Sequence, residues 1–142
     1  MPGACLLVTE EDLVTVTAGT VELEFVGEPE EINDESFFGG ASSVCRRALR
    51  STWSESGGTA TVDGVVTVQL QASGAVAYFP ASGEETVPGI GDEAFRRGDE
   101  LYVRVGTMLA LFRVAIVNPD PDGDATRLEW AKALATQALT RL

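Results

Sequence analysis

The sequence contains no histidine and only one lysine, Lys132. Without histidine, the Ser-His-Asp and Cys-His classes of catalytic site and all histidine-ligated zinc sites are excluded. The phosphate-binding loop that ends in Gly-Lys-Ser or Gly-Lys-Thr is absent too. Gly89 and Gly91 lack the third glycine of a dinucleotide-binding turn. We therefore expect a protein that is not an enzyme, has no catalytic residues and needs no organic cofactor.

Basic residues are scarce, and the first 45 residues contain none. Ten bases stand against 22 acids, which gives a net charge of −12. The acids of that first third are Glu10, Glu11, Asp12, Glu22, Glu24, Glu28, Glu30, Glu31, Asp34 and Glu35. Such a field repels phosphate backbones and anionic lipids, so we expect neither nucleic acid nor a bare membrane surface as a partner. The charge is interpreted first as a source of solubility, and second as an attraction for a cationic partner or metal ion.

Long apolar segments are missing as well. No apolar run reaches the roughly 18 residues that a membrane-spanning helix needs. A chain of 142 residues with 44% hydrophobic content has the size and composition of one globular unit with its own core. We therefore expect a single domain over residues 1–142.

Cysteine occurs at two positions only, Cys5 and Cys45. The pair allows one disulfide, which would close a loop of about 40 residues and stabilise the fold by about 4 kcal/mol. Two buried thiols in a cytosolic protein are the alternative, and the count of cysteines leaves both open. The direct start after Met1 favours the cytosol if it is read literally. The segment Gly3-Ala4-Cys5, in contrast, is similar to the end of a lipoprotein cleavage site.

Helices are predicted near both ends of the chain. Thr9 and Asp12 have the spacing of a capping box, which predicts a helix over 10–18. Thr126 and Glu129 have the same spacing and predict the start of an amphipathic helix that runs to the C-terminus.

Strands are predicted where apolar and β-branched residues alternate or run together, at 21–26, 44–53, 59–71, 100–105 and 107–117. The acid-rich residues 27–43 are predicted as a loop. Gly106-Thr107 suits a two-residue hairpin turn, and the apolar character of the last strand predicts a central place, buried on both faces. The order of elements predicts an α+β fold with one antiparallel sheet of about five strands, and an N-terminal and a C-terminal helix packed on one face.

Two features are candidates for a turn and for ligand contact. Gly89, Gly91, Asp92 and Glu93 are interpreted as a structural turn, because an aspartate after glycine usually binds nearby backbone amides. A catalytic role for the two carboxylates is the weaker alternative. The possible ligand contacts are the aromatic residues Phe37, Phe38, Trp53, Tyr78 and Phe79.

Residues 118–129 partly match the twelve-position calcium loop. Gly123 takes the sixth position, and the candidate oxygen ligands are Asn118, Asp120, Asp122, Asp124 and Glu129. Pro119 and Pro121 stiffen the loop, and a strand rather than a helix precedes it. Calcium is therefore kept as an alternative and not as the main expectation.

Several of these motifs also occur in the DUF3558 family of actinobacterial lipoproteins, which this sequence resembles. The similar segments are Cys5-Leu6-Leu7-Val8-Thr9, Cys45, residues 87–94, residues 103–106 and residues 134–142. The resemblance implies export, a lipid anchor on the full-length precursor and a disulfide between Cys5 and Cys45. It implies no activity.

Three functions follow as expectations. The first is a non-enzymatic binding module of the cell envelope, outside the cytoplasm, with an envelope protein, a peptide or a small ligand as partner and with membrane contact only through the precursor's lipid anchor. The second is a calcium-binding or calcium-stabilised domain that uses residues 118–129. The third is an acidic cytosolic chaperone for a basic secretion substrate.

Overall fold

The computed structural model describes residues 3–34, 42–71 and 85–142. Along the chain these form a 3-10 helix (Ala4–Leu6), α1 (Glu10–Thr17), β1 (Glu22–Phe25), β2 (Glu30–Asp34), β3 (Ser42–Glu55), β4 (Gly58–Gln71), β5 (Glu85–Thr86), β6 (Glu93–Arg97), β7 (Glu100–Val105), β8 (Met108–Ala115) and α2 (Gly123–Leu139). Neither α1 nor α2 combines the length and apolarity that crossing a bilayer would need.

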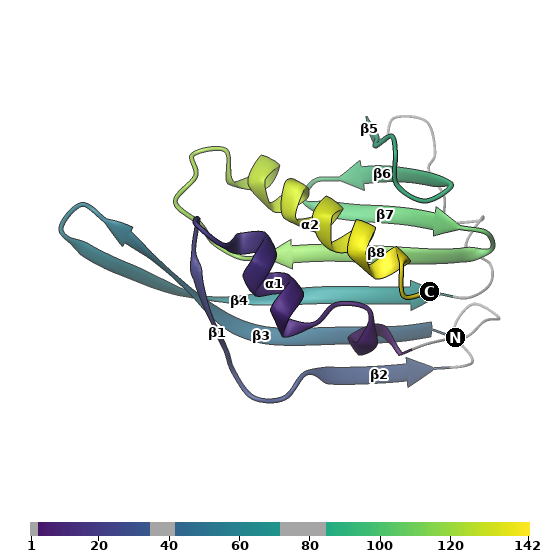
Figure 1. Cartoon of the computed structure of the whole chain (residues 1–142), viewed down its shortest axis with the longest axis horizontal. Coiled ribbons are helices and arrows are strands. Elements are labelled where there is room, and N and C mark those ends of the chain that lie inside the picture. The colour runs from purple at the N-terminus through teal and green to yellow at the C-terminus, as the bar shows by residue number, and fades with distance from the viewer. Residues whose placement is uncertain (1–2, 35–41, 72–84) are drawn as a thin grey trace.

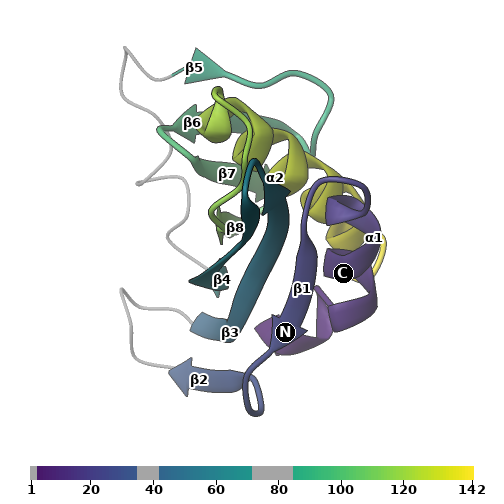
Figure 2. The same ribbon diagram turned by 90° about the vertical axis from the view of Figure 1, so that its left-hand side faces the viewer.

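The strands form one antiparallel sheet in the order β1-β3-β4-β8-β7-β6-β5, and β2 also pairs with β3. Both helices lie on the same face of this sheet, as Figures 1 and 2 show. The predicted α+β class, the single antiparallel sheet and the two helices on one face are confirmed. The predicted number of about five strands is wrong, because the sheet has eight.

Two of the strands that were not predicted lie in segments whose charged residues mask the apolar pattern of a strand. β2 lies within residues 27–43, which were predicted as a loop, and pairs Ile32 with Val44 of β3. Its side chains from Glu31 to Asn33 are exposed, so no alternation between buried and exposed residues marks it. β6 carries only two buried residues, Ala94 and Phe95, between charged neighbours. Edge and near-edge strands of this kind lack the apolar pattern from which strands are predicted.

The longest hairpin joins β3 and β4, and their register runs from Ser42 opposite Gln71 to Glu55 opposite Gly58. The predicted strands at 44–53 and 59–71 are confirmed, and each is slightly longer than predicted. The turn of this hairpin projects past the rest of the sheet in Figure 1. Trp53 therefore lies near a corner of the fold.

β8 lies between β4 and β7, as its apolar sequence predicts. Phe112 and Val114 are buried in the core together with Leu134 of α2. On the opposite face, Leu111 is half-exposed and Arg113 is exposed. The prediction that this strand is buried on both faces is therefore wrong, since the helices cover one face only.

The two predicted capping boxes have different outcomes. Thr9 and Asp12 exchange both expected hydrogen bonds at the start of α1, at 3.2 and 2.9 Å. The prediction of a capping box at Thr126 and Glu129 is wrong, because α2 begins at Gly123, three residues before Thr126. The hydroxyl of Thr126 donates to Asp120 instead.

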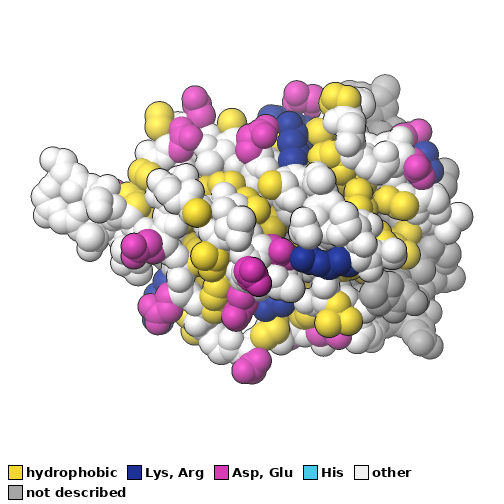
Figure 3. Space-filling model, viewed as in Figure 1, with side chains coloured by type: hydrophobic (Ala, Val, Ile, Leu, Met, Phe, Trp, Pro, Cys, Tyr) yellow, Lys and Arg dark blue, Asp and Glu magenta, His cyan; other side chains and the backbone are white. Residues whose placement is uncertain are grey.

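Charged side chains are scattered over the helix-bearing face shown in Figure 3 and do not gather by sign. The excess of acids over bases is therefore spread across this face. The local charge of a site on it depends on the residues that line the site.

Candidate binding cleft at Trp53

Among the aromatic residues predicted to contact a ligand, Trp53 is the one that the structure describes. Phe37, Phe38, Tyr78 and Phe79 lie outside the described residues. Trp53 is half-buried and follows the buried residues Leu49 and Ser51 at intervals of two along β3, so its side chain points to the same, helix-bearing face. Its indole Nε1 donates a hydrogen bond to Glu55 Oε1 at 3.0 Å.

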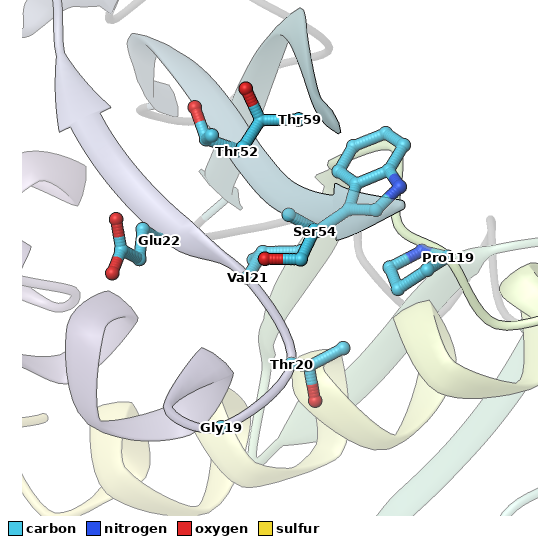
Figure 4. A pocket seen from close by; sticks show the side chains of 9 residues that line it. Gly19, Thr20, Val21, Glu22, Thr52, Ser54, Thr59 and Pro119 are labelled. Carbon is cyan, nitrogen blue, oxygen red and sulfur yellow. The ribbon is translucent and has the colours of Figure 1, made fainter. Parts of the chain in front are cut away.

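Trp53 lines an open cleft of about 460 Å³. The lining comes from four separate parts of the chain: residues 19–22, residues 52–54, Thr59 and Pro119. Figure 4 shows Thr20, Ser54 and Pro119 around this space. The cleft thus forms where the α1–β1 connection, the β3–β4 hairpin and the β8–α2 connection meet.

Local geometry brings these segments together. The α1–β1 connection turns at Gly19, whose φ is +85°, and Val21 donates a backbone hydrogen bond to Thr17 at 3.3 Å. Val21 is also 7% exposed and packs into the core, which fixes the start of β1. The buried Ser51 hydroxyl donates to the carbonyl of Val117 at 2.8 Å. That bond ties the β8–α2 connection to β3 and sets the position of Pro119.

The lining of the cleft combines the apolar residues Val21, Trp53 and Pro119 with polar residues. The hydroxyls of Thr20, Ser54 and Thr59 and the Glu22 carboxylate have no side-chain hydrogen bond or ion pair within the described part of the chain, and all but Thr20 are exposed to water. The Thr52 hydroxyl, in contrast, is 3.0 Å from that of Thr61. None of the described lining residues is basic. In the register of the sheet, Glu22 pairs with Thr52 and Ser54 pairs with Thr59, so these four side chains lie on the opposite face from Trp53.

The residues predicted as a structural turn have the geometry of one. Gly89 and Gly91 have φ values of +85° and +59°, which side-chain-bearing residues rarely adopt. Asp92 Oδ2 accepts a hydrogen bond from the Gly106 amide at 2.7 Å, and the Asp92 amide donates to Arg104 at 2.9 Å. These hydrogen bonds therefore hold the turn against the β7–β8 hairpin. The carboxylate of the next residue, Glu93, lies 3.4 Å from the guanidinium of Arg104.

In the first half of the calcium-like segment, side-chain oxygens bind their own backbone. Asn118 Oδ1 accepts from the Asp120 amide at 3.0 Å, and Asp120 Oδ1 accepts from the Asp122 amide at 2.9 Å. Asp120 also accepts the Thr126 hydroxyl, and this bond is the largest cause of a lowered pKa for its carboxyl.

The remaining carboxylates of that segment pair with bases on α2. Asp124 bonds Arg127, and Glu129 Oε1 is 3.0 Å from Lys132. No group of three or more acidic or cysteine side chains placed to hold a metal ion occurs in the described ranges. The five candidate ligands are therefore close in sequence, but the structure does not bring their oxygens around one point.

The two cysteines form the disulfide that the resemblance implies, with their Cα atoms 4.9 Å apart. The bond joins the 3-10 helix to β3, and Arg47 of the same strand donates to the carbonyls of Cys5 and Val8 at 3.1 and 3.0 Å. A disulfide is consistent with a location outside the cytoplasm. Because the Cys5 sulfur is bonded to Cys45, it is not available in this structure for a lipid thioether.

Searches for similar proteins gave no match for this chain among protein-family models, among curated proteins or among solved structures. The resemblance to the DUF3558 family therefore stays a prediction, and the case for function depends on the site itself.

Proposed function

We propose that this chain is a non-enzymatic binding domain of the bacterial cell envelope, outside the cytoplasm, and that its ligand binds in the Trp53 cleft. The observation that carries the proposal is the half-buried indole of Trp53 in a cleft of about 460 Å³ to which four separate parts of the chain contribute. Ring and polar groups together are the common lining of small-molecule sites.

The size of the cleft supports a small ligand. Its volume of about 460 Å³ falls within the roughly 300–1,000 Å³ of small-molecule sites. A whole folded partner would need a buried interface of about 1,000 Å² or more, which a cleft of this size does not supply alone. We therefore favour a small molecule or one short segment of a larger one.

The disulfide supports the compartment in this proposal, because such bonds persist in oxidising environments. A lipid anchor on the precursor is part of the same proposal and rests on the resemblance. Since Cys5 is paired, we place any such anchor at another residue of the precursor.

Nuclear magnetic resonance (NMR) of the ¹⁵N-labelled oxidised protein tests the proposal. A panel of neutral sugars, amino sugars, short basic peptides and amino acids is added, one compound class at a time. We expect at least one class to move the amide signals of Gly19 and Thr20 and the indole signal of Trp53. Trp53→Ala removes the shifts of the Gly19 and Thr20 amides, whereas the matched exposed change Thr136→Ala on α2 leaves them. Shifts that map elsewhere, or that persist in Trp53→Ala, would contradict the proposal.

A further inference from the structure

We infer that β2 is a docking edge for an extended, basic segment of a partner protein, which adds to the sheet as an antiparallel strand beside Glu30–Asp34. No residue of β2 lines the Trp53 cleft, so the inference goes beyond the proposed function and does not rest on it. It is carried by the topology of the sheet, by the exposure of the β2 side chains and by their charge.

β2 is the outermost strand at its edge of the sheet. It pairs only with β3, where Ile32 stands opposite Val44, and Figures 1 and 2 show no described strand or helix on its outer side. In an antiparallel pair, every second residue points its backbone N–H and C=O groups away from the neighbouring strand. These outer groups of β2 have no backbone partner among the described residues. An added strand can therefore bond to them.

This edge lacks the features by which many proteins block such pairing. β2 contains neither proline nor lysine, and its register with β3 runs residue against residue, without a bulge. The 3-10 helix reaches β2 through Glu31, whose carboxylate accepts the Cys5 amide at 3.0 Å. Glu31 stands opposite the buried Cys45, so the 3-10 helix lies over the helix-bearing face of β2 and leaves its outer edge open.

Glu30 and Ile32 are the side chains of β2 that an added strand would meet on the face opposite the helices. They alternate with Glu31, which points to the helix-bearing side. Glu30 is exposed, and Ile32 is 49% exposed although it is a large apolar residue. Residues directly opposite each other in neighbouring strands are in side-chain contact. An added strand would therefore place one side chain against the Ile32 side chain and one against the Glu30 carboxylate.

Charge determines which strand fits this edge. Residues 1–45 contain ten acids and no base, and Glu30 forms no ion pair within the described chain, although Arg46 stands opposite it. Two copies of β2, paired antiparallel around Ile32, would set Glu30 of each against the acidic Asp34 of the other. Like charges directly opposite each other are destabilising, so a second copy of this chain fits poorly. A basic side chain opposite Glu30 is attracted instead.

The partner segment therefore has a short pattern of its own. Its apolar residue lies opposite Ile32, and its lysine or arginine follows two residues later, opposite Glu30, because the added strand runs antiparallel to β2. β2 has only five residues, so it supplies few hydrogen bonds and weak binding is expected. NMR titration at low salt detects binding of this strength.

The probe is the acetylated and amidated peptide Ser-Thr-Val-Thr-Lys-Thr-Ser, added to the ¹⁵N-labelled oxidised protein. We expect saturable shifts of the amide signals of residues 30–33. A peptide with glutamate in place of lysine should bind about fivefold more weakly or worse. Two further peptides carry N-methyl groups on alternate backbone amides, one on the odd set and one on the even set. Only the set that faces β2 should weaken binding, by about tenfold, because those amides can no longer donate.

Charge reversal on the protein provides the matching control. Glu30→Lys should reverse the preference, so that the glutamate peptide binds more tightly than the lysine peptide. Glu129→Lys changes the net charge equally at an exposed position of α2 and should keep the original preference. Unchanged signals outside β2 show that each variant is folded.

Three results would overturn the inference. The first is the absence of shifts at residues 30–33 with the lysine peptide. The second is equal binding of the two N-methylated peptides, which would show attraction by charge without strand addition. The third is an unchanged preference in Glu30→Lys. The cleft is judged separately, by the compounds that move the Gly19 and Thr20 signals, so either proposal can fail without the other.

Discussion

Arg141 and Asp12, which are 129 residues apart in the sequence, form a two-bond ion pair that fastens the C-terminus to α1. Arg141 Nη1 is 2.5 Å from Asp12 Oδ2, and Nη2 is 3.1 Å from Oδ1. The same Nη1 donates to the carbonyl of Leu7 at 2.6 Å. Asp12 Oδ2 also accepts the amide of Thr9 at 2.9 Å, so this one carboxylate caps α1 and holds the end of the chain.

This pair predicts a pH-dependent contribution to stability. Hydrogen bonding from Arg141 is the largest cause that lowers the pKa of Asp12 from 3.8 to about 2. A lowered carboxyl pKa stabilises the folded state above pH 3.8, and this stabilisation is lost as the pH falls towards 2. We expect Asp12→Asn to lower the free energy of unfolding by about 1–3 kcal/mol at pH 7.

The difference between Asp12→Asn and the wild type should shrink between pH 4 and pH 2, as the native carboxyl is protonated. Urea unfolding at a series of pH values measures it. Glu24→Gln is the matched control, because the ion pair of Glu24 with Arg50 is exposed, and it should change stability by less than about 1 kcal/mol. An Asp12→Asn deficit that stays constant down to pH 2 would show that the ion pair is not its source.

The disulfide between Cys5 and Cys45 spans 40 residues, so its removal should be costly. We expect the double variant Cys5→Ser with Cys45→Ala to lose about 4 kcal/mol of stability, because the unfolded chain regains the entropy of the open loop. Chemical unfolding measures this loss. Thiol labelling of denatured protein, purified without reductant, should find no reactive thiol. Two reactive thiols would instead support the cytosolic chaperone.

Gly91 should tolerate a side chain less well than Gly89. Both have positive φ, but a Cβ at Gly91 would lie 2.6 Å from Val103 and 2.8 Å from the Arg104 carbonyl, whereas a Cβ at Gly89 meets nothing within 4 Å. We expect Gly91→Ala to destabilise by about 2–4 kcal/mol and Gly89→Ala by about 1 kcal/mol. Thermal unfolding of the two variants checks the order, and equal losses would contradict the close packing of this turn.

Calcium should not change the thermal midpoint of the protein. Asp120 is hydrogen-bonded to its own segment, and Asp124 and Glu129 pair with bases of α2, so a cation would have to displace these bonds. Melting in millimolar calcium and in chelator tests this expectation, because a ligand that binds only the native state raises its midpoint. A clear rise with calcium would restore residues 118–129 as a metal site.

Short sequence patterns were enough to predict the elements that are stabilised by residues close together in the sequence. The capping box of Thr9 and Asp12 and the hairpin turn at Gly106 both depend on residues that are near in sequence, and both are found. β2 could not be predicted in this way, because pairing with β3 and not its own composition makes it a strand. The start of α2 was misplaced for a related reason: Thr126 is used by Asp120 and not by the helix end.

The cleft could be predicted only through one of its residues. Trp53 stands out as an aromatic residue in a polar stretch, but Thr20 and Pro119 reach it through the fold. Their approach depends on the buried Val21 and on the hydrogen bond from Ser51 to Val117, which join distant segments. No spacing in the sequence indicates these contacts. The aromatic residue therefore indicated the site, whereas nothing in the sequence indicated the other residues that line it.

The most direct test of the central claim is fluorescence of Trp53 in a Trp130→Phe variant, which removes the other, buried tryptophan. Acrylamide quenching is measured without ligand and with a saturating amount of the compound that moves the cleft signals by NMR, and a compound of the same panel that moves none serves as the control. If Trp53 lies in the ligand site, quenching is efficient in the unliganded protein and falls when the binding compound is present, but not with the control compound. Quenching that is the same in all three conditions, while NMR shows the compound bound elsewhere, would contradict the assignment of the Trp53 cleft as the binding site.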